Sequence, residues 1–470
     1  MLGHHLEPKQ LLFVTRSPIR LLTSQRAPNL YRSRDDNILS VTGSIPPPST
    51  GESMQAGPPE RNPRTIWLLA SCRFSEAAAM GMLIPTLPLF LGTLTSPAAN
   101  QVGESLVTRF PWLAEMLPGL ATASQEARTA FLFSITGLAM ACIQIFAGRF
   151  SDRYDIRKPL IVAGMALGAC CSFCLPLLDS YWQLVLLRIL QGSFLGLTFP
   201  PMMAIVARNA PEESGGKVLG LYSTIRLLGF GLGPVIGGLI GDASGYDQVF
   251  LVSGSLLMVS VVLVSAKVDD PKEFKSTEER ARPLPPIQPI FRLLGAVIFV
   301  MMMGISTVIS LFPFYEREFG STQSELGTMF AIFIATRCLF QYPCGWAGDR
   351  YDKKRMLLLG LLLFIPLVVL QSDATNLSQL TIIRMGLGAV SAMMSTAVGG
   401  ICAERSSPGN RARMMGINTL CFSLGTAVGP SLTGFIDSQQ IAFMIPAAAA
   451  LVLFGALLML LPSDRQARSR

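Results

Sequence analysis

Charged residues and histidine are scarce in this chain of 470 residues. Asp, Glu, Lys and Arg make up 14% of the sequence, whereas soluble domains carry roughly 25%. The two histidines, His4 and His5, lie at the very start of the chain. The composition therefore argues against an ordinary soluble domain, and neither a histidine-based catalytic site nor a histidine metal site is expected.

A phosphate-binding loop is missing too. The glycine-rich stretch from Gly229 to Gly233 leads into Pro234 within an apolar run. A phosphate-binding loop would continue there with Lys and then Ser or Thr. We therefore expect no nucleotide hydrolysis, no enzyme activity and no cofactor.

The nine cysteines do not form a pattern typical of disulfides, because they lie within apolar stretches or at their edges. Cys171 and Cys174 have the spacing of a metal or redox pair, but no second pair and no histidine accompanies them. We interpret them as packing residues and expect no metal site.

Half of the residues are hydrophobic, and they are gathered in long runs. A membrane-spanning helix needs about 20 mostly apolar residues to cross about 30 Å of hydrocarbon. We predict an all-α membrane protein with twelve transmembrane helices. The predicted spans are 66–94, 126–149, 158–178, 182–207, 217–241, 248–266, 291–315, 323–347, 355–371, 378–402, 412–436 and 441–461.

The net charge of +8 is concentrated in alternate connections between the spans. A nucleic-acid-binding protein would instead collect its basic residues on one face, so lipid is the expected surrounding and no nucleic acid is expected. Basic loops stay on the cytoplasmic side of a membrane, which predicts that both termini are cytoplasmic. The basic connections are 149–158, 267–292, 353–355, 405–413 and 465–470.

Two polar segments divide the chain. Residues 1–62 are rich in Pro, Ser and Arg and are predicted to form a disordered cytoplasmic tail. Their basic composition also resembles an organellar transit peptide, and a start at Met54 is a further alternative. Residues 267–289 are predicted to be a cytoplasmic linker. The predicted domains are an N-terminal six-helix bundle at 63–266, a C-terminal six-helix bundle at 290–462 and a cytoplasmic tail at 463–470.

The two predicted bundles carry the same motif. Gln144-x-x-x-Gly148-x-x-x-Asp152-Arg153-Tyr154-Asp155 recurs about 197 residues later as Gln341-x-x-x-Gly345-x-x-x-Asp349-Arg350-Tyr351-Asp352. The offset persists downstream, where Arg188 aligns with Arg384 and Gly233-Pro234 aligns with Gly429-Pro430. The chain is therefore predicted to be a tandem pair of related, pseudo-symmetric halves.

These motifs resemble those of the major facilitator superfamily, and the resemblance covers about residues 65–462. The resemblance implies that the loop motif acts as a gating latch between the halves. The alternative is that its charges only set the membrane topology of the chain. Asp155 and Asp352 stand where the family has Gly, and Asp tolerates a left-handed backbone, so the tight turn is expected to survive. The matching positions are Gly148, Asp152, Arg153, Arg157, Lys158, Gly345, Asp349, Arg350, Lys354 and Arg355.

Two other stretches resemble motifs of the proton-coupled branches of that family. Arg188-Ile189-Leu190-Gln191-Gly192 is similar to a motif associated with proton coupling, although Arg188 could instead snorkel to the membrane surface. A second run resembles the antiporter motif, in which small residues allow close helix contact. Its positions are Gly229, Gly233, Pro234, Gly237 and Gly238, and Gly81, Pro85 and Pro88 add a pattern typical of drug:proton antiporters.

Glu76 lies about ten residues into the first predicted span and is the one acid that we find deep in a span. Burial favours the protonated acid, and a nearby guanidinium favours the carboxylate. Alternation between such surroundings would load and release a proton, so Glu76 is the predicted proton carrier. The alternative is a permanent structural ion pair with Arg73, one turn earlier.

Arg73, Arg226 and Arg337 are predicted at mid-depth in their spans. Three guanidinium groups against one carboxylate leave an excess of positive charge, which predicts a site that attracts an anionic or carboxylate-bearing substrate. With Arg188, these residues are the candidates for binding substrate or tuning Glu76.

The sequence thus predicts a multi-pass secondary transporter in a bacterial inner membrane or a eukaryotic membrane. We expect a monomer that exports a small organic solute in exchange for protons by alternating access. A facilitator or importer of an anionic metabolite is the alternative within transport. A non-transporting receptor or scaffold is the alternative from another class, because a fold alone does not determine function.

Overall fold

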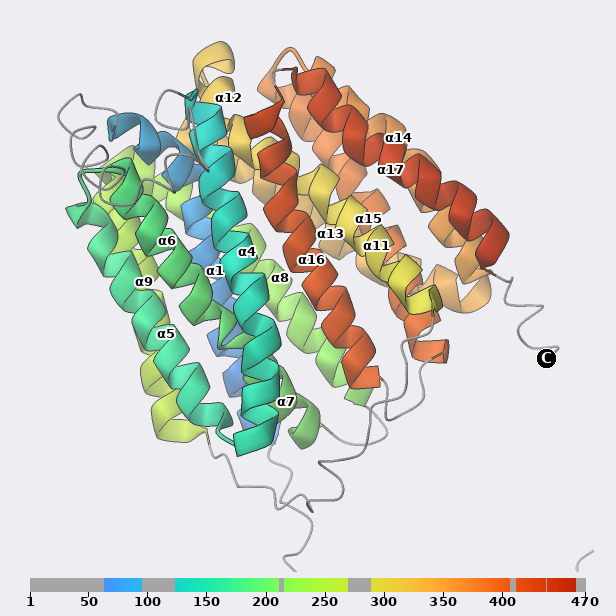
Figure 1. Cartoon of the computed structure of the whole chain (residues 1–470), viewed down its shortest axis with the longest axis horizontal. Helices are drawn as coiled ribbons and strands as arrows, with labels where there is room; N and C mark the ends of the chain where they lie inside the picture. The colour runs from blue at the N-terminus through green and yellow to red at the C-terminus, as the bar shows by residue number, and fades with distance from the viewer. Residues whose placement is uncertain are drawn as a thin grey trace, which may run out of the picture. The chain divides into compact units, whose positions relative to one another are not determined.

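The computed structural model describes residues 63–94, 123–210, 215–268, 289–405, 411–436 and 438–461 (Figure 1). Every regular element in these ranges is a helix. The predicted tails at 1–62 and 463–470 and most of the predicted linker lie outside the described residues. Those parts of the domain prediction therefore stay predictions.

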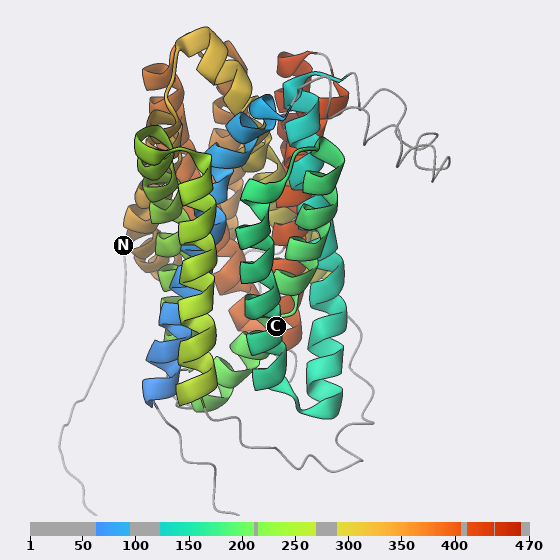
Figure 2. The same ribbon diagram turned by 90° about the vertical axis from the view of Figure 1, so that its left-hand side faces the viewer.

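Each predicted span corresponds to one helix or to consecutive helical pieces, and the long helices of the first half run nearly parallel (Figure 2). The first half contains α1 (Pro63–Thr93), α4 (Gln125–Tyr154), α5 (Arg157–Cys174) with η1 (Leu175–Leu177), α6 (Tyr181–Gly196), α7 (Phe199–Asn209), α8 (Gly215–Ser244) and α9 (Tyr246–Lys267). The second half contains α11 (Pro289–Ser306), η2 (Thr307–Leu311), α12 (Phe312–Phe319), α13 (Gln323–Arg350), α14 (Lys353–Leu370) with η3 (Gln371–Asp373), α15 (Leu377–Arg405), α16 (Arg411–Phe435) and α17 (Gln439–Leu460).

Ten helical segments in the described ranges are long and apolar enough to cross a membrane. The helices α13 and α16, with 28 and 25 residues, are long enough but less apolar, and they complete the predicted twelve. Both pack against the other half, α13 along α8 and α16 along α4. Their lower hydropathy has a physical reason, because small and polar side chains replace lipid-facing ones where two helices meet.

Glycines let α8 pack closely on both sides. Gly229, Gly233 and Gly237 face α1, where a Cβ on any of them would overlap a backbone carbonyl of that helix. Gly238 faces the backbone of α13 at Gln323 and Ser324, and Gly231 faces the Ile334 side chain of the same helix. The run predicted from the antiporter motif is thus a contact surface that holds α8 between the first helix of its own half and a helix of the other half.

Two predicted spans are interrupted within their length. The fourth span is divided between α6 and α7 at Leu197 and Thr198. The seventh span changes to a buried 3₁₀ segment at Thr307–Leu311 between α11 and α12. Such interruptions within a span are typical of sites where transporters bind ligands or bend.

The halves are joined at the end of the molecule that carries the short neutral or acidic connections, which we name the acidic-loop end. There the Asp242 carboxylate accepts hydrogen bonds from the backbone N–H groups of Gln323 (3.2 Å) and Ser324 (2.9 Å), and so caps α13 from the other half. Arg317 pairs with Glu126 across the same end. The opposite end, with the junctions α4–α5 and α13–α14, is named the basic-loop end.

The contact of Gly233 with α1 gives a test of this packing. We expect Gly233→Ala to destabilise the protein by about 1–3 kcal/mol, because the added methyl group would overlap the Ala78 carbonyl. Gly220→Ala in the same helix is the matched control, since a Cβ there has nothing within 4 Å. Thermal unfolding in detergent measures both; equal midpoints for the two variants would contradict the close contact.

Candidate functional site

A central cavity lies between the two halves. Its larger part is lined by residues of α1, α4, α6, α8, η2 and α16. The volume free of protein atoms there, including the part open to solvent, is about 910 Å³. A smaller part, lined by α8, α11, η2, α13 and α16, shares Arg226, Phe230 and Phe422 with the first, so the two form one cavity.

The structure brings together all of the charged residues that the sequence predicted for this site. Arg73, Glu76, Arg188 and Arg226 line the larger part of the cavity. Arg337 lines the smaller part. They come from α1, α6, α8 and α13, which are far apart in the sequence.

Arg73 and Glu76 form a buried ion pair on α1. Nη1 of Arg73 lies 2.6 Å from Oε2 of Glu76, and the two side chains are 5% and 4% exposed. The hydroxyl of Thr198 donates a hydrogen bond of 2.9 Å to Oε1 of Glu76. Among the described side chains, Glu76 is the one buried carboxylate. The pair is formed in this state of the protein, which both the proton-carrier role and the structural role require.

Arg226 enters the cavity from α8 and finds an aromatic partner. Its guanidinium lies 5.2 Å from the ring centre of Phe422 on α16. Arg73 and Arg337 are close enough to repel its charge, and Glu76 is close enough to attract it. Of the arginines in the cavity, Arg73 is the one with a carboxylate at ion-pair distance within the described residues. The cavity wall is therefore positively charged overall.

Arg188 is turned inward and does not snorkel to the membrane surface. It is 2% exposed and donates to the side-chain oxygen of Gln191, whose amide nitrogen donates to Ser172 on α5 at 2.8 Å. The repeat-related Arg384 on α15 is fully buried as well, and its Nη1 donates to the Ile305 carbonyl at 2.8 Å. We did not predict Arg384, although its alignment with Arg188 was a signal that pointed to it.

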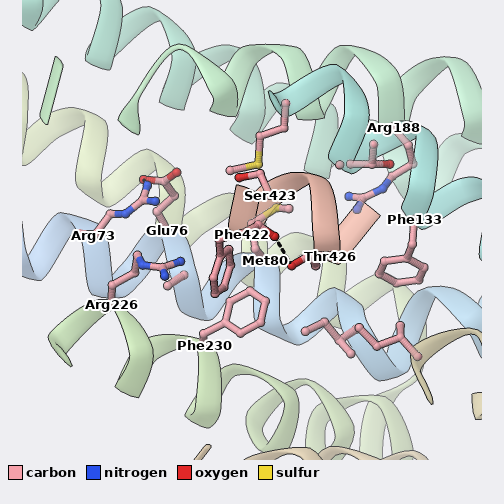
Figure 3. A pocket seen from close by; sticks show the side chains of 16 residues that line it. Arg73, Glu76, Met80, Phe133, Arg188, Arg226, Phe230, Phe422, Ser423 and Thr426 are labelled. Atoms are coloured by element: carbon pink, nitrogen blue, oxygen red, sulfur yellow. Dashed lines mark hydrogen bonds and ion pairs between the residues drawn. The ribbon is translucent and has the colours of Figure 1, made fainter. Parts of the chain in front are cut away.

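The middle of the cavity is apolar. Figure 3 shows Phe230, Phe422 and Met80 between two charged regions, with Arg73, Glu76 and Arg226 on one side and Arg188 on the other. Aromatic rings and methionine can bind the apolar body of a solute, while guanidinium groups bind its charged or polar groups. The cavity therefore suits an amphipathic organic molecule.

Tyr222 and Thr198 are contacts of the ion pair that the sequence prediction missed. Tyr222 on α8 is 1% exposed, its hydroxyl has no hydrogen-bond partner within the described residues, and the charges of Arg73, Glu76 and Arg226 act on it. Tyr222 stands four residues before Arg226, so the two lie on the same face of α8, and this spacing could have been used to predict that Tyr222 belongs to the site. Thr198 lies between α6 and α7 in the same half as α1 but far from Glu76 in the sequence, so its contact with Glu76 depends on the tertiary structure.

The two copies of the loop motif differ in their turns. Asp155 ends α4 in the left-handed conformation, with φ 52 and ψ 43, as predicted. The same prediction is wrong for Asp352, which has φ −66 and ψ 115. The Asp352 carboxylate caps α14 by accepting a 2.9 Å hydrogen bond from the backbone N–H of Lys354. Because Tyr351 before it is already extended, the second turn needs no left-handed residue.

Other residues of the loop motif contact their own half. Gly148 packs against Pro200 of α7, Lys354 donates to the Leu458 carbonyl at the end of α17, and the Arg350 guanidinium lies 4.1 Å from the ring centre of Trp346. The side chains of Asp152 and Asp349 lie outside the described ones. The gating latch between the halves therefore stays a prediction.

Comparison with known proteins agrees with this architecture. The sequence profile of the Major Facilitator Superfamily matches residues 69–296 and 294–470. The chain is 25% identical over 377 residues to the multi-drug resistance efflux pump PmrA of Streptococcus pneumoniae, covering 78% of this chain and 87% of PmrA. It is 26% identical over 410 residues to the multidrug resistance protein MdtG of Salmonella paratyphi A, covering 85% of this chain and 94% of MdtG.

Solved structures show the same fold. A bacterial homologue of the human lysosomal transporter Spinster, solved in an inward-facing and occupied conformation, superimposes with a TM-score of 0.64 at 14% sequence identity. The match covers 84% of this chain and 96% of that protein.

Two related six-helix halves around a charged central cavity define a membrane transporter of the alternating-access class. The family matches extend over nearly all of the described residues. The chain belongs to the major facilitator superfamily, and its relatives include a multi-drug resistance efflux pump and a multidrug resistance protein.

The ion pair gives a second test. We expect Arg73→Met to destabilise the protein by about 3 kcal/mol or more near neutral pH, because it leaves the buried Glu76 carboxylate without its counter-charge. The double variant Arg73→Met/Glu76→Gln should recover part of the loss, since a neutral amide needs no counter-charge. Thermal unfolding of Arg73→Met and of the double variant Arg73→Met/Glu76→Gln measures this. If the double variant is no more stable than the single one, the pair does not account for the loss.

Proposed function

We propose that this chain is a proton-coupled secondary transporter that exports a small organic solute, with Glu76 as the acid that carries the proton. The observation that supports this most directly is a buried carboxylate, paired with Arg73, in the wall of a cavity shared by both halves. Ionisable groups inside a membrane are costly, so their presence favours a functional role. The similarity to PmrA, a multi-drug resistance efflux pump, and to MdtG, a multidrug resistance protein, supports export of drug-like molecules.

The proton cycle depends on two different surroundings for Glu76. In the state described here, Arg73 lies against the acid and supplies a counter-charge for its carboxylate. A rocking motion that separates the two groups would favour the protonated acid, because a buried carboxylate without a counter-charge is unstable. Exchange of solute for protons then follows if the solute and the proton occupy the site in alternate states.

We also propose an orientation in the membrane. Loops rich in Lys and Arg stay in the cytoplasm, so the basic-loop end and both termini face that side. The contacts between Asp242 and α13, and between Arg317 and Glu126, then close the external side of the cavity. The loop motifs near Gly148 and Gly345 would close the cytoplasmic side in the opposite state. One chain supplies the whole cavity, which supports a monomer as the working unit.

A second candidate function is the transport of an organic anion together with protons. It is favoured by four arginines against a single carboxylate in the cavity. The Nε atoms of Arg188 and Arg337 are buried and have no hydrogen-bond partner within the described residues. A carboxylate on the solute would supply acceptors for such donors.

The two candidates differ in how protons affect solute binding. If the exported solute of the first candidate is a cation, the ionised Glu76 attracts it. Protonation of Glu76 then weakens its binding, as exchange requires. An anion is repelled by the ionised Glu76 and competes with it for Arg73. Protonation therefore strengthens anion binding, and the proton and the anion move together.

Transport in proteoliposomes tests the primary proposal, with ethidium as a cationic probe. We expect a pH gradient to drive ethidium across the membrane, and Glu76→Gln to reduce this flux to the level of empty liposomes, because an amide carries no proton. Ethidium exchange without a pH gradient should persist in the variant, since the amide occupies the same volume. Flux through Glu76→Gln that still responds to the gradient would rule out Glu76 as the proton carrier.

Radiolabelled para-aminohippurate, which bears a carboxylate, tests the second candidate. If the anion is the substrate, its binding should strengthen as the pH falls, and Arg226→Gln should weaken it by about 10- to 100-fold, because a charged hydrogen bond is lost. Arg64→Gln at the exposed start of α1 is the control. Transport of ethidium alone would reject the anion candidate, and no flux of either probe through folded protein would favour a non-transporting role.

A further inference from the structure

The fourth span is broken beside the Arg73–Glu76 pair. Pro200 and Pro201 have no backbone N–H, so the carbonyls of Gly196 and Leu197 cannot receive the usual helical hydrogen bonds. α6 consequently ends at Gly196, and α7 begins at Phe199.

The matching helix of the second half has no such break. The repeat that aligns Arg188 with Arg384 places Met394 and Thr396 at the positions of Thr198 and Pro200. In that half α15 continues without interruption from Leu377 to Arg405. The break is therefore confined to the half that holds the buried acid.

Thr198 at the break and Phe199, the first residue of α7, both contact the ion pair. Oγ1 of Thr198 lies 2.9 Å from Oε1 of Glu76, and the Arg73 guanidinium lies 4.7 Å from the ring centre of Phe199. Thr198 is fully buried, and its methyl group lies toward Gly164 of α5. This packing holds the hydroxyl on the side of Glu76.

The Thr198 hydroxyl has two acceptors within reach but only one hydrogen. The carbonyl oxygen of Leu195 lies 2.8 Å from Oγ1, and Glu76 lies 2.9 Å from it. An ionised Glu76 can only accept, so it takes the hydrogen of Thr198. A protonated Glu76 donates its own hydrogen to Oγ1, and the Thr198 hydrogen then turns to the Leu195 carbonyl.

We propose that Thr198 is a positioning residue that transmits the protonation state of Glu76 to α7. The proposal rests on the proposed role of Glu76 as proton carrier. When Glu76 is ionised, Thr198 ties the break to α1. When Glu76 is protonated, Thr198 closes the last turn of α6, and Arg73, freed from its ion pair, interacts more strongly with Phe199.

The position of α7 matters for the predicted gate. Pro200 packs on Gly148, the glycine of the first loop motif; a Cβ at Gly148 would lie 3.6 Å from Cβ of Pro200. α7 also packs against α4 and α5. Glu76 is thus linked to the end of α4 by neighbouring groups: Glu76 contacts Thr198, Pro200 follows Thr198 by two residues, and Pro200 lies beside Gly148.

Glu76, the proposed proton carrier, is the one buried carboxylic acid beside this break among the described residues. The other charged or titratable groups that act on it are Cys72 and Arg73 from α1 and Tyr222 and Arg226 from α8. The α6–α7 junction contributes the uncharged Thr198, and α9 contributes Ser260, which faces Cys72. None of these neighbours is a carboxylic acid or a histidine.

Hydrogen–deuterium exchange of the full chain in nanodiscs tests the proposal without a substrate. Peptides covering Phe199–Asn209 and the region of Gly148 are followed at two pH values on either side of the wild-type transition, after correction for the intrinsic effect of pH. We expect a pH-dependent difference in the wild type, its loss in Glu76→Gln and in Thr198→Val, and its return in Thr198→Ser, which keeps the hydroxyl. Peptides from α15 serve as the internal control.

The outcomes separate the two proposals. A difference that persists in Glu76→Gln shows that another group titrates, and the proposed role of Glu76 fails. A difference lost in Glu76→Gln but kept in Thr198→Val leaves Glu76 in place and overturns the role of Thr198. Loss in both, without return in Thr198→Ser, also overturns it, as does a wild type without a response in α7. Thr198→Ala replaces Thr198→Val if the valine variant does not fold.

Discussion

Water does not reach the hydrocarbon layer of a membrane, so each charged group placed there needs partners that the protein itself supplies. This constraint explains where the charged residues of this chain lie. Arg73 has Glu76, Arg188 has Gln191, Arg384 has the Ile305 carbonyl, and Arg226 has the Phe422 ring. These partners come from facing helices or from the same turn, and Arg73, Arg188 and Arg226 line the cavity between the halves.

Close helix contact is what makes that arrangement possible. α8 carries Arg226 and Tyr222, and its glycines let it lie directly against α1 on one side and α13 on the other. Side chains larger than glycine at these contacts would push the helices apart and would separate Tyr222 and Arg226 from the ion pair on α1. The glycine contacts set the spacing between the helices, and this spacing sets the distances between the buried charges.

Much of the fold was predictable from the sequence, because apolar runs of span length and an internal repeat are local properties of the chain. The interruptions were harder to see. The stretch 182–207 reads as one apolar span, although Pro200 and Pro201 divide it into α6 and α7, and 291–315 contains the 3₁₀ segment Thr307–Leu311. The turn at Asp155 followed from residue preference, whereas the turn at Asp352 depended on how α13 ends and α14 is capped.

The sequence by itself determined the class of protein, the number of spans, the relation between the halves and the identity of the charged residues within the membrane. Hydrophobic runs and the internal repeat are properties of the linear sequence, so they can be recognised without knowing which residues meet in space. Only the tertiary structure decided which of those charges meet, because a distance between α1, α6, α8 and α13 depends on how four helices pack. For the same reason it was the fold that placed the Thr198 hydroxyl, from the junction of α6 and α7, within hydrogen-bond distance of the Glu76 carboxylate.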